Sequence, residues 1–136
     1  MARLFLEVVT PEKVVVSQEV DLVMAPGTEG EFGILPGHIA FLSGIIPGEL
    51  RFDNGDKKEY MAVTFGFAEI SNDRVSVLVD SAEKAGDIDI ERAQRAMERA
   101  KARLEKESEK EDVDILRAEA ALKRAVSRMK VAKKAA

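Results

Sequence analysis

Glycine, proline and aromatic residues are confined to one part of this 136-residue chain. All nine glycines, all four prolines and all seven Phe and Tyr residues lie within residues 1–86, while residues 87–136 contain none of them and eleven alanines. Charge divides at the same place: residues 1–86 hold 7 Lys and Arg against 14 Asp and Glu, and residues 87–136 hold 14 against 11. Glycine and proline favour the turns that end short strands, aromatic residues favour the strands themselves, and alanine favours helix. We therefore expect an α+β chain whose two parts join near Gly86.

Short β-branched and aromatic runs alternate with turn signals throughout residues 1–86. The runs cover residues 14–16, 20–24, 50–52, 60–64 and 75–79. Strands at this spacing are typical of an antiparallel sandwich or barrel, and we predict an N-terminal antiparallel β-sandwich. The strongest hairpin signal is Asp53-Asn54-Gly55-Asp56, because a primed turn needs positive φ and Asn-Gly adopts it at low cost.

From Asp87 onward the apolar period changes from two residues to about three and a half. Two seams follow that period: Ile90, Ala93, Met97, Ala100 and Leu104, then Ile115, Ala118, Leu122, Ala125, Met129 and Ala132. Residues 87–136 are therefore predicted to form a two-helix antiparallel hairpin, with Asp87 as the first N-cap. The charged run 106–111 suits a turn but equally suits continuous helix, so a folded hairpin and an extended rod both stay open. Alanine-rich seams bury little apolar area, which makes such a contact weak.

Composition argues against most enzyme classes. Without cysteine the chain has no disulfide, thiol nucleophile or zinc–thiolate site, and His38 is its single histidine. The longest apolar stretches are too short to span a membrane, and the strand-like start is unlike a signal peptide. Glycines at 27, 30, 33 and 37 have a phosphate-loop spacing, but no Gly-Lys-Ser/Thr and no amphipathic helix follows. Turns and bulges are predicted there, with a structural or interface hydrogen bond for His38.

The last helix is basic on one side. After Glu119 the charged residues are all cations: Lys123, Arg124, Arg128, Lys130, Lys133 and Lys134. Three interpretations stay open, namely favourable charge at a helix C-terminus, binding of nucleic acid, and contact with an acidic protein surface. The net charge of −4 and the lack of interleaved aromatic residues make nucleic acid the weakest of the three.

Several motifs resemble the epsilon subunits of bacterial F-type ATP synthases. They are the run Gly-Glu-Phe-Gly-Ile-Leu-Pro-Gly-His at 30–38, Gly-Phe-Ala-Glu-Ile at 66–70, Ile-Asp-x-x-Arg-Ala at 88–93 and the alanine-rich basic helix. The resemblance covers essentially the whole chain in order. It implies a β-sandwich at 1–86, a regulatory and mobile helical hairpin at 87–136, and a non-catalytic rotor subunit. That subunit would be peripheral to the cytoplasmic face of the bacterial cell membrane.

The resemblance also implies partners. The sandwich would bind the gamma subunit and the ring of c subunits, with Glu31 and His38 facing the ring. In an extended state the helices would reach the catalytic beta and alpha subunits and inhibit ATP hydrolysis. Lys123, Arg124, Arg128 and Lys130 would then face an acidic loop, where complementary charge acts on positioning and association rate.

A regulatory ATP site is the last implication of the resemblance, and no cofactor is required. Ile88, Asp89, Arg92 and Ala93 match the family's nucleotide motif, while Glu83, Arg99, Arg124 and Arg128 stand at the other contributing positions. Guanidinium groups suit phosphates because they form charge-assisted forks. The motif equally suits a plain helix start, with Asp89 as a first-turn acid. An ATP-hydrolysing enzyme would lack a P-loop lysine, metal ligands and a positioned base. The alternative function is a stand-alone nucleotide-sensing or nucleic-acid-binding adaptor.

Overall fold

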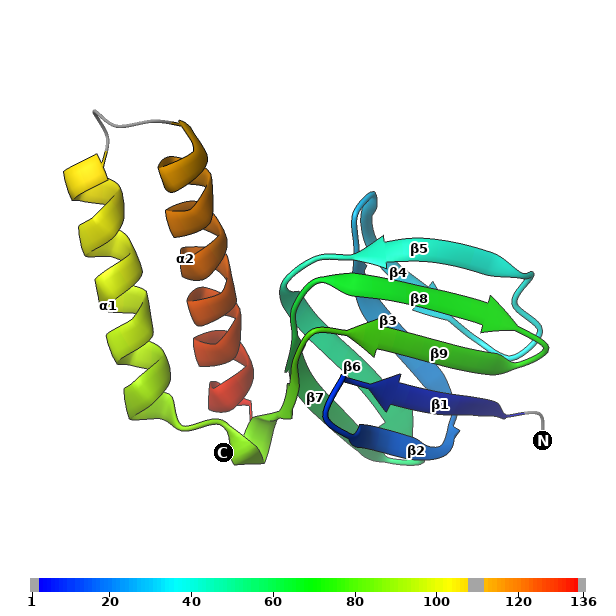
Figure 1. The fold of residues 1–136 in the computed structure, drawn as a ribbon. Coiled ribbons are helices and arrows are strands. Elements are labelled where there is room, and N and C mark those ends of the chain that lie inside the picture. Colours follow the sequence, from blue (N-terminus) through cyan, green and yellow to red (C-terminus); the bar gives the residue numbers. More distant parts are fainter. Residues whose placement is uncertain (1–2, 108–111, 135–136) are drawn as a thin grey trace.

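The structure is a computed structural model that describes residues 3–107 and 112–134. Within these ranges, strands fill the first part and two helices the second (Figure 1). The strands are β1 Leu4–Val9, β2 Val14–Val20, β3 Leu22–Gly27, β4 Gly30–Ile34, β5 Phe41–Ile45, β6 Gly48–Asn54, β7 Lys57–Val63, β8 Gly66–Ser71, β9 Arg74–Val79 and β10 Ala82–Lys84. A 3₁₀ turn at Ala85–Asp87, η1, leads into α1 Ile90–Glu107 and α2 Asp112–Lys133. The predicted α+β class is confirmed.

The strands form a sandwich in the order β10-β7-β6-β3-β5-β8-β9-β1-β2, with β4 paired to β3. In Figure 1, β5, β8, β9 and β1 lie in front of β3, β6 and β7. Neighbouring strands are antiparallel, as predicted, except that β1 and β9 are parallel. These two strands lie far apart in the sequence, so no tight hairpin imposes an antiparallel pairing on them.

The sandwich core follows the predicted alternation. Val75, Val77 and Val79 of β9 are buried, and so are Leu4, Leu6 and Val8 of β1 beside it. Each such side chain stabilises the fold by about 1.5–3 kcal/mol when fully buried. The inward-facing side chains of the two layers of strands thus form one apolar core.

Two hairpin turns use positive φ in different ways. At the predicted Asn-Gly hairpin, Asn54 pairs with Lys57, so the loop consists of Gly55 and Asp56 and the positive φ of 63° falls on Gly55. The turn that was predicted at Asn54-Gly55 is therefore shifted by one residue along the chain. A glycine at the first of the two loop positions is typical of a type II′ turn. The turn between β8 and β9 has positive φ at both Asn72 and Asp73, as in a type I′ turn.

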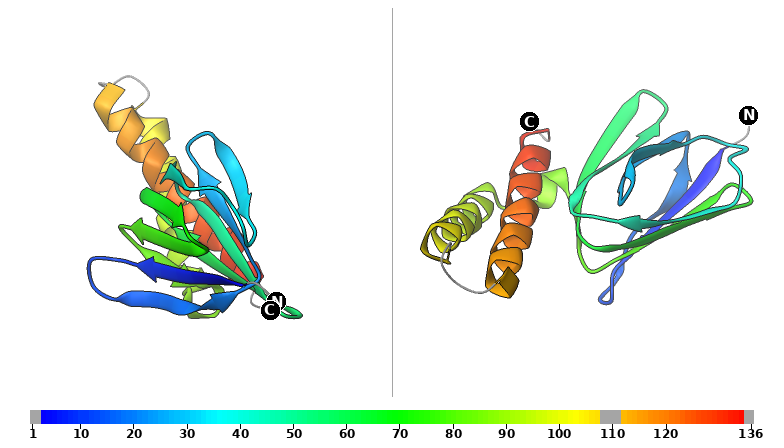
Figure 2. Two further views of the ribbon diagram at one scale, coloured as in Figure 1. Left: turned by 90° about the vertical axis from the view of Figure 1, so that its right-hand side faces the viewer. Right: turned by 90° about the horizontal axis from the view of Figure 1, so that it is seen from above.

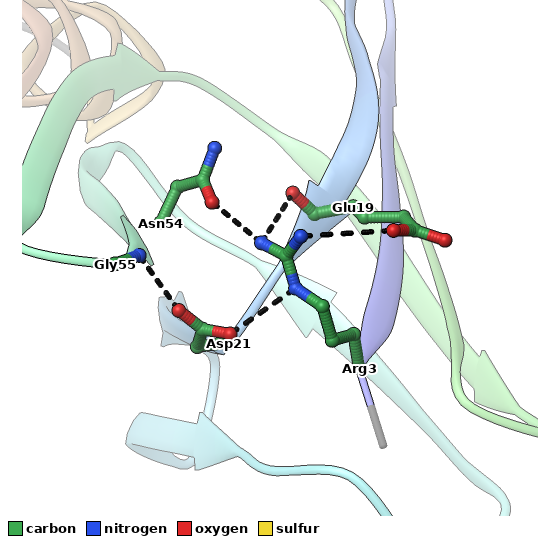
Figure 3. Close-up of polar contacts among 5 residues, drawn as sticks. All are labelled: Arg3, Glu19, Asp21, Asn54 and Gly55. Atoms are coloured by element: carbon green, nitrogen blue, oxygen red, sulfur yellow. Dashed lines mark hydrogen bonds and ion pairs between the residues drawn. The ribbon is translucent and has the colours of Figure 1, made fainter. Parts of the chain in front are cut away.

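A polar network fastens the sandwich at the end away from the helices (Figure 3). Arg3 donates hydrogen bonds to Asp21 Oδ1 at 3.2 Å, to the Glu19 carbonyl oxygen at 3.2 Å and to Asn54 Oδ1 at 2.5 Å. The other Asp21 oxygen accepts the Gly55 N–H at 2.7 Å. This hydrogen bond, together with the charge of Arg3, holds the pKa of Asp21 below 3.8 against the effect of desolvation. The network joins the start of β1, the β2–β3 corner and the β6–β7 hairpin.

The helices lie side by side next to the sandwich (Figure 2). The predicted seams meet at Ala93, Ala100, Ala118 and Ala125, which are at most 3% exposed, whereas Ile90 of the predicted first seam is 47% exposed. Asp87 is not the N-cap of the first helix, which corrects the prediction. It belongs to η1, and Asp89 caps α1 instead, because Asp89 Oδ1 accepts the Arg92 backbone N–H at 3.1 Å.

The predicted turn at 106–111 lies partly outside the described residues, since 108–111 are not described. Residues 106 and 107 still belong to α1.

The last turns of α2 carry its contact with the sandwich. A second apolar cluster joins them to η1, α1 and β7: Ala62, Ala85, Ile88, Ala93, Val131 and Ala132, with Tyr60 and Met129 at its edge. Val131 is fully buried although it lies off the predicted seam, because it faces the sandwich rather than α1 alone. Four of these eight side chains are alanines, and each alanine contributes little apolar area to the contact.

Candidate nucleotide site and interfaces

A cleft of about 710 Å³ lies between α1, α2 and the sandwich. Its lining is Thr64, Ser81, Glu83, Arg92, Ala96, Arg99, Ala100, Arg103, Ala121, Arg124, Ala125 and Arg128. Five arginines and one carboxylate therefore share a single concave surface with four alanines. The volume lies within the range of small-ligand sites.

Helical spacing explains why the arginines converge. Arg92, Arg99 and Arg103 are seven and four residues apart on α1, and Arg124 and Arg128 are four apart on α2, so each group lies on about one face. The paired helices bring both faces to the cleft. Small alanines between the arginines keep the cleft open.

Glu83 supplies the carboxylate from β10. Its Oε1 lies 2.7 Å from Arg128 Nε, and its Oε2 accepts a hydrogen bond from Arg128 Nη2 at 3.2 Å. The side chains are 35% and 23% exposed, so this contact is partly shielded from water and ties α2 to the sandwich. Within the described part of the chain, Arg92, Arg99, Arg103 and Arg124 form no ion pair. The cleft therefore carries an excess of positive charge.

Three residues of the predicted site do not line the cleft. Ile88 and Ala93 are 7% and 0% exposed in the cluster between the helices and the sandwich. Asp89 holds the first turn of α1 through its N-cap hydrogen bond. These residues position Arg92 by fixing where α1 begins.

Sequence reasoning missed Arg103, Thr64 and Ser81. Arg103 had a signal, since it stands four residues after Arg99. Thr64 Oγ1 accepts the Ser81 backbone N–H at 3.0 Å, which joins the end of β7 to the residue before β10. That pairing spans 17 residues, and no local pattern in the sequence indicates it.

The four residues of the predicted inhibitory face are divided between two surfaces. Arg124 and Arg128 face the arginine cleft. Lys123 and Lys130 instead line a groove of about 810 Å³ on the other side of α2. Its remaining lining residues are Ile46, Pro47, Gly48, Glu49, Leu122, Val126, Ser127, Lys133 and Lys134. In this arrangement no single surface presents all four cations.

Glu31 and His38 stand at opposite ends of β4. Glu31 is exposed in the strand, and His38 follows it in the connection to β5. His38 Nδ1 lies 2.7 Å from the Ile39 carbonyl oxygen, and its ring meets the Phe41 ring edge-on at 5.9 Å between centroids. Large apolar side chains are exposed beside His38 in the chain or against its ring, namely Leu35, Ile39 and Phe41. An exposed apolar group at a loop end is typical of an interaction surface.

A second apolar surface crosses the outer face of the sandwich. Phe67 lies opposite Leu78, Leu78 opposite Val9, and Val9 opposite Val14. Phe67, Leu78 and Val14 are 47%, 41% and 56% exposed. We call these four residues the outer apolar row. Four strands contribute to it, so only the strand register assembles it.

Among the side chains at residues 3–106 and 115–134, no group of three or more His, Asp and Glu is placed to hold a metal ion. In the same ranges, neither helix has the length and apolarity needed to cross a bilayer.

Two family models match the chain, one for each part. The ATP synthase Delta/Epsilon chain beta-sandwich domain matches residues 3–85, and the ATP synthase Delta/Epsilon chain long alpha-helix domain matches residues 87–133. The chain belongs to the ATP synthase delta/epsilon family. It is an epsilon-type, non-catalytic subunit of the F-type ATP synthase.

Similar ATP synthase epsilon chains come from several bacteria. That of Desulfosudis oleivorans is 54% identical over 104 residues, which are 76% of this chain and 78% of the relative. That of Syntrophobacter fumaroxidans is 52% identical over 102 residues, or 75% and 76%. The resemblance noted in the sequence is thereby confirmed.

Solved structures show the same fold. A chain in the Euglena gracilis mitochondrial ATP synthase, described as OSCP/F1/c-ring in rotational state 1, matches with a TM-score of 0.81 at 25% identity, covering 93% of this chain and 79% of that chain. A chain in the Tetrahymena thermophila mitochondrial ATP synthase central stalk and c-ring matches with a TM-score of 0.55 at 17% identity, covering 99% and 98%. At that identity the second match shows the fold alone.

Proposed function

We propose that the helices of this epsilon-type subunit inhibit ATP hydrolysis when extended, and that ATP bound in the arginine cleft selects the compact arrangement. The observation that carries the proposal is the convergence of five arginines and Glu83, from α1, α2 and β10, on one cleft. Phosphates are the ligands that such a set of guanidinium groups binds best.

Electrostatics links the ligand to the conformation. Without an anion the unpaired arginines repel one another across the cleft, which favours separation of the helices. A triphosphate reverses that preference, and an extended arrangement loses the site because its arginines belong to different elements. A ligand shifts such an equilibrium only through this difference in affinity.

Glu83 and Arg128 have two roles in this scheme. Their contact already fastens α2 to β10 before nucleotide binds. When a phosphate approaches Arg128, Glu83 is released to accept a hydrogen bond from the adenine amino group or a ribose hydroxyl. Asp89, Ile88 and Ala93 contribute by holding the start of α1, which places Arg92.

The partner surfaces extend the proposal. The outer apolar row is suited to the gamma subunit, because a contiguous exposed apolar surface on a sandwich face gains from being covered. The His38 loop and Glu31 are suited to the c-ring. In the extended arrangement Lys123, Arg124, Arg128 and Lys130 become free to face an acidic loop of the catalytic beta and alpha subunits.

Calorimetric titration of the full chain with ATP tests the nucleotide site. We expect binding with wild type, and a weakening of about 1.5–3 kcal/mol, or about tenfold to hundredfold, in Arg92→Ala and Arg124→Ala. Arg95→Ala is the matched control, since Arg95 is an exposed arginine of α1 outside the cleft. Absence of binding at millimolar ATP, or equal affinity of both cleft variants and wild type, would refute the site.

A further inference from the structure

Lys134, directly after α2, contacts two neighbouring strands at once. Its Nζ lies 2.5 Å from Glu49 Oε1 on β6 and 4.7 Å from the centre of the Tyr60 ring on β7. Glu49 is 28% exposed and Lys134 44%, so water screens the pair only in part. A single ammonium group thus has a carboxylate and an aromatic face as partners.

The surrounding contact is weak enough for this group to matter. Val131 and Ala132 of α2 share one apolar cluster with Ala62, Ala85, Ile88 and Ala93, and four of these six side chains are alanines. The Glu83–Arg128 contact lies on the nucleotide side of α2, whereas Lys134 lines the opposite groove. The two polar contacts therefore fasten α2 independently, one inside the cleft and one outside it.

We propose that Glu49, Tyr60 and Lys134 form a latch that holds the end of α2 on the sandwich and sets how often the compact arrangement opens when no nucleotide is bound. This inference rests on the proposed compact–extended equilibrium, but not on nucleotide binding. A partly exposed ion pair together with a cation–π contact shifts an equilibrium by about threefold to tenfold. Salt weakens the ion pair, so the latch also makes opening depend on ionic strength.

Thiol labelling measures the opening directly. The chain has no cysteine, so Val131→Cys, at a fully buried position of α2 in its cluster with the sandwich, supplies a unique thiol. When closing is faster than labelling, the labelling rate follows the open fraction. In this background and without nucleotide, Glu49→Gln and Lys134→Met should each raise the labelling rate about threefold to tenfold.

Lys133→Met is the matched control. Lys133 is the adjacent residue, is exposed, lines the same groove and carries the same charge, but forms no ion pair within the described residues. It should leave the labelling rate unchanged. Raising salt from about 0.02 M to about 0.5 M should speed labelling more in the parent than in Lys134→Met, because both have the Glu83–Arg128 pair but only the parent also has the Glu49–Lys134 pair to screen.

Three outcomes would overturn the latch. The first is a change of less than about twofold in both Glu49→Gln and Lys134→Met. The second is an equal effect of Lys133→Met, which would indicate general charge rather than a specific contact. The third is an equal rise at a second reporter, Val23→Cys in the sandwich core, which would indicate unfolding of the whole chain. A calorimetric failure to bind ATP would leave this test intact, since it contains no nucleotide.

Discussion

Gly66 is the first residue of β8 and lies very close to the backbone of β9. Replacing it with alanine should greatly lower the temperature at which the sandwich unfolds. An ideal Cβ at this position would lie 1.9 Å from the Leu78 carbonyl oxygen and 2.7 Å from Val79 Cα. All the near atoms belong to the backbone, so no side-chain rotation relieves the overlap. Strands β8 and β9 would have to separate by more than an ångström.

The magnitude follows from that separation. Opening this end of the ladder, where Gly66 pairs with Val79 and Phe67 with Leu78, costs about two backbone hydrogen bonds at about 1 kcal/mol each. Strain from overpacking adds about 1–3 kcal/mol. The total of about 3–5 kcal/mol is a large part of the stability of a small domain. At about 4 °C or more per kcal/mol, Tm should fall by about 12 °C or more.

Thermal unfolding followed by circular dichroism of the β-sheet measures this effect. Gly86→Ala is the matched control, because no heavy atom lies within 4 Å of a Cβ there and φ is not positive. The control should be neutral or slightly stabilising. A Gly66→Ala variant that melts within about 2 °C of wild type would refute the reasoning, since β8 and β9 could not then be as close as described.

Three further predictions concern pH, domain independence and regulation. Because the pKa of Asp21 is lowered, its contribution to stability should be complete above pH 3.8 and should be lost as pH falls through the folded pKa. Asp21→Asn should therefore destabilise the chain at neutral pH, and its free energy of unfolding, measured in urea, should fall less steeply in acid than that of wild type. An unchanged slope in acid would contradict this. Residues 1–86 alone should melt cooperatively and still bind gamma, with Phe67→Glu abolishing that binding; a molten, aggregating fragment would show that the core needs the helices. Deleting residues 87–136 should leave rotor assembly intact and relieve inhibition of ATP hydrolysis. A truncated complex that hydrolyses ATP no faster than the full one under inhibiting conditions would show that these residues do not cause the inhibition.

Local patterns in the sequence were sufficient to predict the fold class and which arginines of the site share a face of each helix. The alternation of Val75, Val77 and Val79 depends only on which face of a strand each residue meets, and that repeats every two residues. The alanine seams and the arginine spacings depend only on the helical repeat, so the sequence alone is enough to place Arg92 with Arg99, and Arg124 with Arg128, on one helix face each. The resemblance then supplied Glu83, which no periodicity indicates.

The cap of α1 and the burial of two motif residues were decided by the tertiary structure alone. Asp87 and Asp89 are equally good caps in sequence, and only the path of the chain through η1 selects Asp89. Ile88 and Ala93 match a nucleotide motif, yet docking of α2 buries them in the cluster between the helices and the sandwich.

The Glu83–Arg128 contact joins residues 45 positions apart, and the latch joins Glu49 and Tyr60 to Lys134 across the whole second half of the chain. Contacts of this kind are set by strand register and by the docking of α2. Both depend on the free energy of the complete fold, so no local repeat in the sequence encodes them.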